Sequence, residues 1–185
     1  TAMGKKVAEA VGKRLGKSLL ELGGNNAMII TPNADLKITT IAAVFGAIGT
    51  CGQRCTSTRR LIVHNDIYNE LKAILTKAYA QIKIGNPLDE NNHMGPLIDA
   101  LAVKQYQKAI DQAIQEGGKV VCEGGVIKNA KLEGGCYVKP CIIEAKNTFS
   151  VVQSETFAPI LYLIKYDNIE EAIAIQNNVP QGLSS

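Results

Sequence analysis

Hydrophobic residues recur along the chain at helical spacing in some segments and in short continuous runs in others. Met3, Val7, Val11 and Leu15 lie at helical spacing, with charged residues on the opposite side, which predicts an amphipathic helix over residues 2–16 that Gly16 closes. Further helices are predicted at 35–48, 67–82, 99–116 and from 169 onward. Short apolar runs predict strands at 19–20, 27–30, 61–63, 120–121, 137–143 and 160–166.

The alternation of helices and strands predicts the fold class. It is typical of an α/β domain with three αβα layers and a largely parallel sheet, and the sequence shows no internal repeat. Asp35 is a good N-cap for the second helix, and Asp99 opens the helix predicted at 99–116. That helix is apolar on most sides, so we expect it to be buried and to project the polar loop after it, residues 50–55, from a rigid interior element.

Composition narrows the class of protein. The chain has 185 residues, 46% hydrophobic and 20% charged, with a formal net charge of +3, which is ordinary for a soluble domain. The charges form no block of one sign, so no nucleic-acid partner is expected. No apolar run approaches the roughly 18 residues that span a membrane. A small soluble ligand is the favoured partner.

Five cysteines are an odd number without the spacing of a disulfide framework, which favours free thiols in a reducing compartment. Cys122 and Cys141 fall in apolar strand runs, as structural cysteines do. Cys55 instead follows Gly52-Gln53-Arg54 and precedes three hydroxyl residues, in a loop that can expose a nucleophilic thiol. Cys51 shares this loop, but the chain has two histidines and no second close cysteine pair, so no metal site is predicted.

Glu21 is the candidate general base. It ends the apolar run 19–20 and precedes Gly23-Gly24, which leave room for a ligand. An isolated glutamate at this place could be a polar strand terminus. Apolar neighbours such as Leu20 and Leu22, however, favour a carboxyl group that takes a proton from water near neutrality.

Arg54 in the same loop has two interpretations. Its side chain is either solvated or salt-bridged, or it binds an anionic group of the substrate. Glu155 and Phe157, in Ser154-Glu155-Thr156-Phe157-Ala158-Pro159, carry little information in isolation.

Four ordered motifs make the whole chain resemble the NAD(P)-dependent aldehyde dehydrogenase superfamily. They are Leu20-Glu21-Leu22-Gly23-Gly24, Gly52-Gln53-Arg54-Cys55-Thr56, Met94-Gly95-Pro96-Leu97 and Glu155-Thr156-Phe157-Ala158-Pro159. Within the superfamily, Asn25-Asn26, Gly49-Thr50 and Gln181-Gly182-Leu183-Ser184-Ser185 look most like family 7, the antiquitin or α-aminoadipic semialdehyde dehydrogenase branch.

The resemblance implies a mechanism and a set of roles. Cys55 would attack the aldehyde carbon, and its backbone N–H would help to hold the oxyanion of the thiohemiacetal. Hydride transfer to NAD would leave a thioester, which water activated by Glu21 would hydrolyse. Glu155 would bind the nicotinamide ribose, while Phe157 and a backbone contact from Leu22 would lie by the nicotinamide. Thr56 would line the substrate pocket, and Arg54 favours an acidic substrate such as α-aminoadipic semialdehyde.

The resemblance also implies that the chain is a piece of a longer protein. Residues 1–24 would end the dinucleotide-binding domain, and residues 25–185 would form most of the catalytic domain, truncated at its C-terminus. Thr50 stands where the superfamily often has Asn, and Thr1 and Gly4 resemble the tail of a Gly-Ser-Thr-x-x-Gly turn. We expect the fragment alone to be inactive. For the whole protein we expect a homo-oligomer in the cytoplasm, or in mitochondria if an upstream address exists.

Two alternatives remain open at this point. A cofactor-independent cysteine hydrolase or acyltransferase would use Cys55 with a histidine base, for which only His64 and His93 are available. A non-catalytic interaction module could keep a dehydrogenase-like fold without a reactive Cys55.

Overall fold

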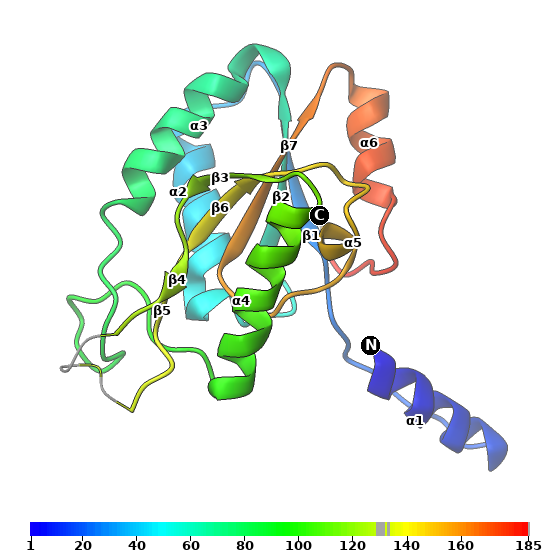
Figure 1. Ribbon diagram of the computed structural model, residues 1–185. Helices are drawn as coiled ribbons and strands as arrows, with labels where there is room; N and C mark the ends of the chain where they lie inside the picture. Colours follow the sequence, from blue (N-terminus) through cyan, green and yellow to red (C-terminus); the bar gives the residue numbers. More distant parts are fainter. Residues whose placement is uncertain (129–131, 133, 185) are drawn as a thin grey trace.

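The computed structural model describes residues 1–128, 132 and 134–184, and it confirms the predicted α/β architecture (Figure 1). A five-stranded sheet has the strand order β1-β2-β7-β6-β3, in which β1, β2, β7 and β6 are parallel and β3 pairs antiparallel with β6. These strands are β1 (Asn26–Ile30), β2 (Thr58–His64), β7 (Ile160–Tyr166), β6 (Cys141–Glu144) and β3 (Lys119–Cys122). A separate two-stranded ribbon pairs β4 (Gly125–Val126) with β5 (Val138–Lys139).

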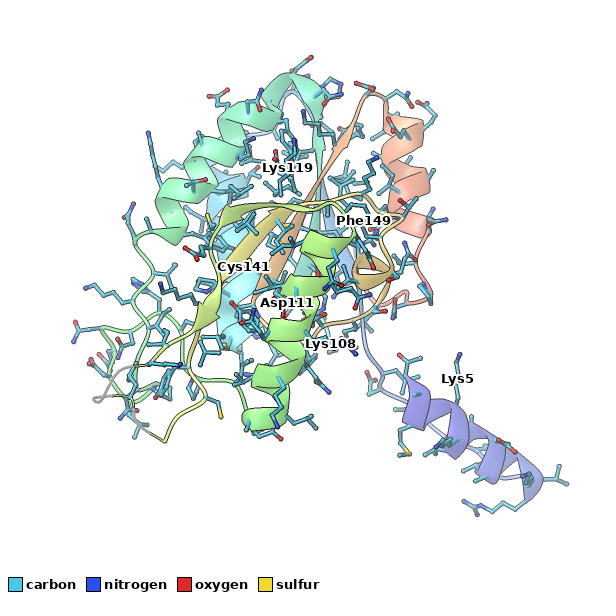
Figure 2. The ribbon with its side chains drawn as sticks, in the orientation of Figure 1. Lys5, Lys108, Asp111, Lys119, Cys141 and Phe149 are labelled. Carbon is cyan, nitrogen blue, oxygen red and sulfur yellow. The ribbon has the colours of Figure 1, made fainter. Side chains whose placement is uncertain are left out.

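Helices cover both faces of the sheet (Figure 1). One face carries α2 (Leu36–Ile48) and α3 (Asn65–Tyr79), and the other carries α4 (Ala100–Gln115), α5 (Ser150–Gln153) and α6 (Ile169–Asn177). Alternation along β2 explains this layering, because Leu61 and Val63 join the large core cluster while Ile62 packs with Ala172 of α6. Charged side chains such as Lys108 and Asp111 on α4 project outward (Figure 2).

The helix ends follow the predicted capping. The Asp35 carboxylate accepts hydrogen bonds from the backbone N–H groups of Lys37 and Ile38 at the start of α2. Asp99 accepts one from Ala102 at the start of α4. These contacts satisfy N–H groups that have no partner within the helix, which fixes where each helix begins.

Two strand predictions are wrong in detail. Residues 19–20 form no strand, and Leu19 is 85% exposed, because no neighbouring strand in the described part of the chain pairs with this segment. The run 137–143 is divided between β5 and β6 at Pro140, which has no N–H group to continue a ladder. The helix α1 (Ala2–Lys13) is three residues shorter than predicted and lies away from the sheet (Figure 1).

The expectation that α2 is a buried helix is wrong for one of its sides. Its residues Thr39, Ala43, Ala47 and Ile48 face the core, whereas Ile38, Ile41 and Phe45 are 63–65% exposed. A helix packed on a sheet buries only one stripe, and Ile41 and Phe45 on the other stripe of α2 border an open groove. In the part of the chain that the structure describes, no helix is both long and apolar enough to cross a membrane.

Candidate active site

The loop that carries Cys55 begins with a strained turn at the end of α2. The turn η1 (Gly49–Gly52) holds Thr50 and Cys51 at φ of 55°, a left-handed conformation that side chains rarely adopt. Gly52 has φ of 67°, and a Cβ there would lie 2.5 Å from the carbonyl oxygen of Ala158. The turn is therefore pressed against the Ala158-Pro159 backbone, and only glycine fits.

The two cysteines of this loop have opposite environments. Cys51 is buried, and its burial raises the pKa of the thiol to about 12, so it stays protonated and inert at neutral pH. Cys55 is exposed on the turn before β2. The structure thus leaves Cys55 as the accessible thiol of the pair.

Gln53 fastens the loop to the Met94-Gly95-Pro96-Leu97 motif. Its side-chain amide donates to the carbonyl oxygen of Pro96 at 3.3 Å and accepts from the N–H of Ile98 at 2.9 Å. A sequence motif that carries no reactive group therefore has a structural part in the site, because it anchors the residue two positions before Cys55.

The glycine pair Gly23-Gly24 brings the other motifs to the loop. A Cβ on Gly23 would overlap the Glu155 carboxylate, and a Cβ on Gly24 would overlap the carbonyl oxygen of Cys55. The N–H of Gly24 also donates to Oε1 of Glu155 at 3.1 Å. The segments of Glu21, Cys55 and Glu155, far apart in sequence, therefore meet at these two glycines.

Asn26, noted in the sequence only for its likeness to family 7, is a site residue that the sequence analysis did not predict. Its amide nitrogen donates to the carbonyl oxygen of Cys55 at 2.7 Å and to that of Ser57 at 3.0 Å. The amide thus closes the loop from the β1 side. Its position beside the glycine pair was the available signal, but a buried asparagine that follows a turn is common.

Arg59 is the second residue that sequence reasoning missed. Its guanidinium, with 3% side-chain exposure, lies 3.5 Å from the Glu155 carboxylate and donates to the carbonyl oxygens of Gly52, Arg54 and Thr156. Burial lowers the pKa of Arg59, while the nearby Glu155 carboxylate acts in the opposite direction. Two arginines at the start of an apolar strand, Arg59-Arg60, were the signal.

Glu155 and Phe157 lie together against Arg59. The Glu155 side chain is 17% exposed, and two donors leave part of its acceptor capacity for a ligand. The Phe157 ring is 44% exposed, with its centroid 5.4 Å from the Arg59 guanidinium carbon. An acceptor of hydroxyl groups beside an open aromatic face suits a ligand that carries a sugar and a planar ring.

Glu21 differs from the expectation. It is exposed and lies in an extended segment without strand pairing, and Leu20 beside it is 36% exposed. The apolar surroundings expected for this carboxyl group are therefore absent in the described structure. Leu22 next to it packs instead on Gly4 of α1, where a Cβ would collide with the Leu22 side chain.

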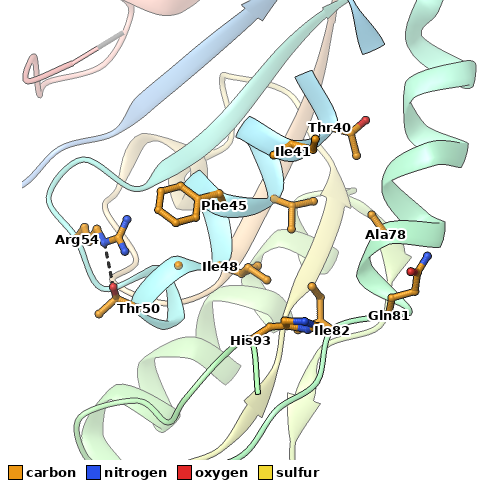
Figure 3. Close-up of a pocket in the computed structure, with 12 residues that line it drawn as sticks. Thr40, Ile41, Phe45, Ile48, Thr50, Arg54, Ala78, Gln81, Ile82 and His93 are labelled. Carbon is orange, nitrogen blue, oxygen red and sulfur yellow. Dashed lines mark hydrogen bonds between the residues drawn. The ribbon is translucent and has the colours of Figure 1, made fainter. Parts of the chain in front are cut away.

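Arg54 lies at one end of an apolar groove of about 530 Å³ that α2 and α3 line (Figure 3). Its Nε donates to the Thr50 hydroxyl at 2.9 Å, and its guanidinium lies 5.0 Å from the centroid of the Phe45 ring. Ile41 and Ile48 extend the apolar wall. Thr56, next to Cys55, is exposed.

The histidines are placed for structural contacts. His64 ends β2, six residues and about 20 Å along the strand from Thr58, and its Nδ1 accepts from the N–H of Asp66. Nδ1 of His93 accepts from the N–H of Lys83 at 3.0 Å. Neither hydrogen bonds to Cys55 within the described ranges. Among the same residues, no three His, Cys, Asp or Glu side chains gather in a way that could hold a metal ion.

Comparisons with known proteins give the relatives of this chain. The chain is 48% identical to the α-aminoadipic semialdehyde dehydrogenase of Bos taurus, over 100% of this chain and 34% of that protein. It is 44% identical to the aldehyde dehydrogenase family 7 member A1 of Pisum sativum, over 99% of this chain and 35% of that protein. The chain therefore spans about a third of the length of these relatives.

The fold of this chain is also found in a solved structure. The betaine aldehyde dehydrogenase of Staphylococcus aureus, in complex with NAD⁺, superposes with a TM-score of 0.95 at 28% identity, over 98% of this chain and 36% of that one. The sequence profile of the aldehyde dehydrogenase family matches residues 1–185. With the profile matching from end to end, this chain belongs to the aldehyde dehydrogenase family.

Proposed function

We propose that this chain carries the nucleophile and part of the cofactor site of an enzyme that oxidises an aldehyde to a carboxylic acid with NAD. The observation that carries the proposal is the meeting of three motifs. Cys55 is exposed, its carbonyl oxygen lies against Gly24, and the N–H of Gly24 is bonded to Glu155. The nucleophile and the ribose-binding carboxylate are thus neighbours of one glycine.

The described residues fit a nicotinamide cofactor. Glu155 retains acceptor capacity for ribose hydroxyls, and the exposed face of Phe157 lies beside it. Gly23 leaves the space that Glu155 occupies. When bound, NAD would accept the hydride of the substrate carbon. The dinucleotide complexes of similar enzymes, such as the betaine aldehyde dehydrogenase, support this assignment.

The chain's own residues supply the other parts of the reaction. The Cys55 thiolate attacks the aldehyde carbon, and the backbone N–H of Cys55 donates to the oxyanion that forms. After oxidation the acyl group is a thioester on Cys55. Glu21 takes a proton from a water molecule that attacks this thioester, and the thiolate leaves as the carboxylic acid forms. An exposed Glu21 has access to the water that this step consumes.

The narrower substrate proposal is α-aminoadipic semialdehyde. An aliphatic aldehyde that ends in a carboxylate matches a groove with the apolar wall of Ile41 and Phe45 and with the guanidinium of Arg54 at one end. Thr56, which is exposed and follows the nucleophile directly, would contact the substrate beside the thiol. The name of the Bos taurus relative, at 48% identity, supports this substrate.

Substitution of Cys55 in the full-length protein tests the proposal. Cys55→Ser should abolish aldehyde oxidation while NAD binding is retained, because the serine hydroxyl is far less nucleophilic at neutral pH. Cys136→Ser is the matched control, since Cys136 is also partly accessible but belongs to another loop. Normal turnover by Cys55→Ser would eliminate the assignment. The isolated 185-residue chain should show no aldehyde oxidation.

No observation favours the alternatives. A cysteine hydrolase needs a histidine that hydrogen bonds to the thiol, and the hydrogen bonds of His64 and His93 within the described residues go elsewhere. A non-catalytic module would require an unreactive Cys55. Alkylation of Cys55 by iodoacetamide at neutral pH, at a rate no faster than that of a free cysteine peptide, would favour that module.

A further inference from the structure

We propose that Arg59 is a positioning residue that couples the cofactor carboxylate Glu155 to the peptide group carrying the Cys55 N–H. This inference rests on the proposed function and adds a residue to it. Its basis is a single buried guanidinium that contacts both halves of the site. Toward the cofactor side it lies 3.5 Å from Oε1 of Glu155, and toward the nucleophile loop it donates to the carbonyl oxygen of Arg54 at 3.2 Å.

The contact with Arg54 acts on the oxyanion donor. The carbonyl oxygen of Arg54 and the N–H of Cys55 belong to the same planar peptide group. A cation on that carbonyl fixes the plane of the group and polarises its N–H, which makes it a stronger donor. A second hydrogen bond, to the carbonyl oxygen of Gly52 at 3.3 Å, holds the turn two residues earlier.

The next peptide group is held by a side chain from a different strand, β1. Asn26 donates to the carbonyl oxygen of Cys55 at 2.7 Å. The two carbonyls that flank the Cys55 side chain are thus each held by a side chain from outside the loop, Arg59 for the preceding one and Asn26 for the following one. With both fixed, the direction of the Cys55 N–H is set before a substrate arrives.

The contact with Glu155 links this arrangement to the cofactor. Arg59 also donates to the carbonyl oxygen of Thr156 at 2.5 Å and stacks on Phe157, so it contacts every residue of the Glu155-Thr156-Phe157 segment. A ligand that draws on the Glu155 carboxylate changes how strongly this carboxylate attracts Arg59. That change reaches the Arg54 carbonyl through one guanidinium, without movement of the backbone.

Stability alone does not explain a cation at this place. A buried ion pair is often no more stabilising than packed hydrophobic side chains of the same volume. The neighbouring Arg60, 0% exposed, makes an equally dense set of hydrogen bonds to Asn25, Asn147, Ile175 and Gln176, none of which belongs to the nucleophile loop. Arg60 therefore serves as the comparison for a buried arginine with a purely structural role.

A double-mutant cycle in the full-length enzyme tests the inference. Arg59→Gln should raise the KM for NAD and lower kcat, each at least about fivefold, which is within the coupling expected for contacting charges. Glu155→Gln should give losses of the same kind. The double variant Arg59→Gln/Glu155→Gln should be no more than about twofold worse than the worse single variant, because both changes remove one coupled unit.

Two further variants separate positioning from folding. Arg59→Lys keeps the charge near Glu155 but cannot reach all three carbonyls, so it should restore most of the KM for NAD and little of kcat. Arg60→Gln should lower the thermal midpoint of unfolding, yet leave the KM for NAD unchanged and combine additively with Glu155→Gln. Thermal unfolding of every variant shows that the kinetics refer to folded protein.

The outcomes are distinct. Coupling between Arg59 and Glu155, with additivity for Arg60, supports the inference. Additive effects of Arg59→Gln and Glu155→Gln overturn it. So does a loss of activity in Arg59→Gln that only follows the folded fraction of the protein, as in Arg60→Gln. Both outcomes leave the proposed function intact. Full aldehyde oxidation by Cys55→Ser would instead overturn the proposed function, and this inference with it.

Discussion

Gly52→Ala tests how tightly the nucleophile loop is held against the rest of the site. At Gly52 an added Cβ would lie 2.5 Å from the carbonyl oxygen of Ala158, 2.6 Å from its carbonyl carbon and 2.8 Å from the nitrogen of Pro159. These neighbours are backbone atoms, which cannot rotate away. Restoring an ordinary contact of 3.4 Å therefore requires a backbone shift of about 0.9 Å.

The expected losses follow from this shift. A side chain at φ of 67° costs about 1–2 kcal/mol, and overpacking against backbone adds about 1–3 kcal/mol. The free energy of unfolding should fall by about 2–5 kcal/mol, a large part of the roughly 5–15 kcal/mol by which a typical domain is stable. Gly52 is three residues before the nucleophile Cys55, so a displacement of nearly 1 Å at Gly52 should misplace the thiol. We expect kcat/KM of the full-length enzyme to fall about 100-fold.

Urea unfolding of the chain and the alkylation rate of Cys55 provide the assay, with two glycine controls. Gly125→Ala also places a side chain at positive φ, 133°, but has no atom within 4 Å, so it should lose stability and leave Cys55 alkylation unchanged. Gly12→Ala, inside α1 with open space around it, should gain about 0.5–1 kcal/mol. The reasoning is refuted if Gly52→Ala keeps wild-type stability and the wild-type alkylation rate.

Three further predictions concern the thiols, a helix cap and an ion pair. Iodoacetamide at pH 8 should label Cys55 in the folded chain and leave Cys51 unlabelled until urea unfolds it, because burial raises the pKa of Cys51 to about 12; peptide mass spectrometry that finds equal labelling would contradict the assigned environments. Asp35→Ala should lower the free energy of unfolding by about 1 kcal/mol in urea titrations, whereas Asp35→Asn should keep most of it, and equal losses would show that the cap is unimportant. Burial raises the pKa of Glu144, but hydrogen bonds from Lys72 and Tyr68 outweigh this and hold it below its ordinary value. A lowered folded-state pKa stabilises the fold above the unfolded pKa of about 4.3 and stops doing so as pH falls through the folded value. Lys72→Gln should therefore cost about 0.5–1 kcal/mol at pH 7 and progressively less below pH 4, and a cost that does not change with pH would show that the pair is not responsible.

Local signals in the sequence predicted the fold well. Asp35 and Asp99 cap helices where their side chains and positions indicated, and the short apolar runs 61–63 and 160–166 lie within parallel neighbours of one sheet. These features depend on a few consecutive residues, so periodicity and capping chemistry are sufficient to predict them. The predicted division at residue 24 is not tested by the structure, and Ser185 lies outside the described residues.

Predictions that depend on distant contacts were less complete. The motifs of Cys55 and Glu155 were recognised by resemblance, but Arg59 contacts Thr156 across 97 residues of sequence, and no local pattern reports such a contact. The predicted burial of several side chains was wrong for a related reason. The apolar residues Ile41 and Phe45 of α2 and the segment before Glu21 looked buried from composition, yet burial depends on which neighbours exist in the fold.

Trapping the acyl intermediate tests the central claim most directly. Full-length protein with Glu21→Gln, incubated with NAD and an aldehyde, should accumulate a thioester because its hydrolysis lacks a base. Trypsin cleavage after Arg54 and Arg59 isolates Cys55 in one short peptide, in which no other cysteine is present. The account predicts that the mass of the acyl group appears on the Cys55 to Arg59 peptide. An acyl group on a different cysteine, or unimpaired turnover without any adduct, would contradict it.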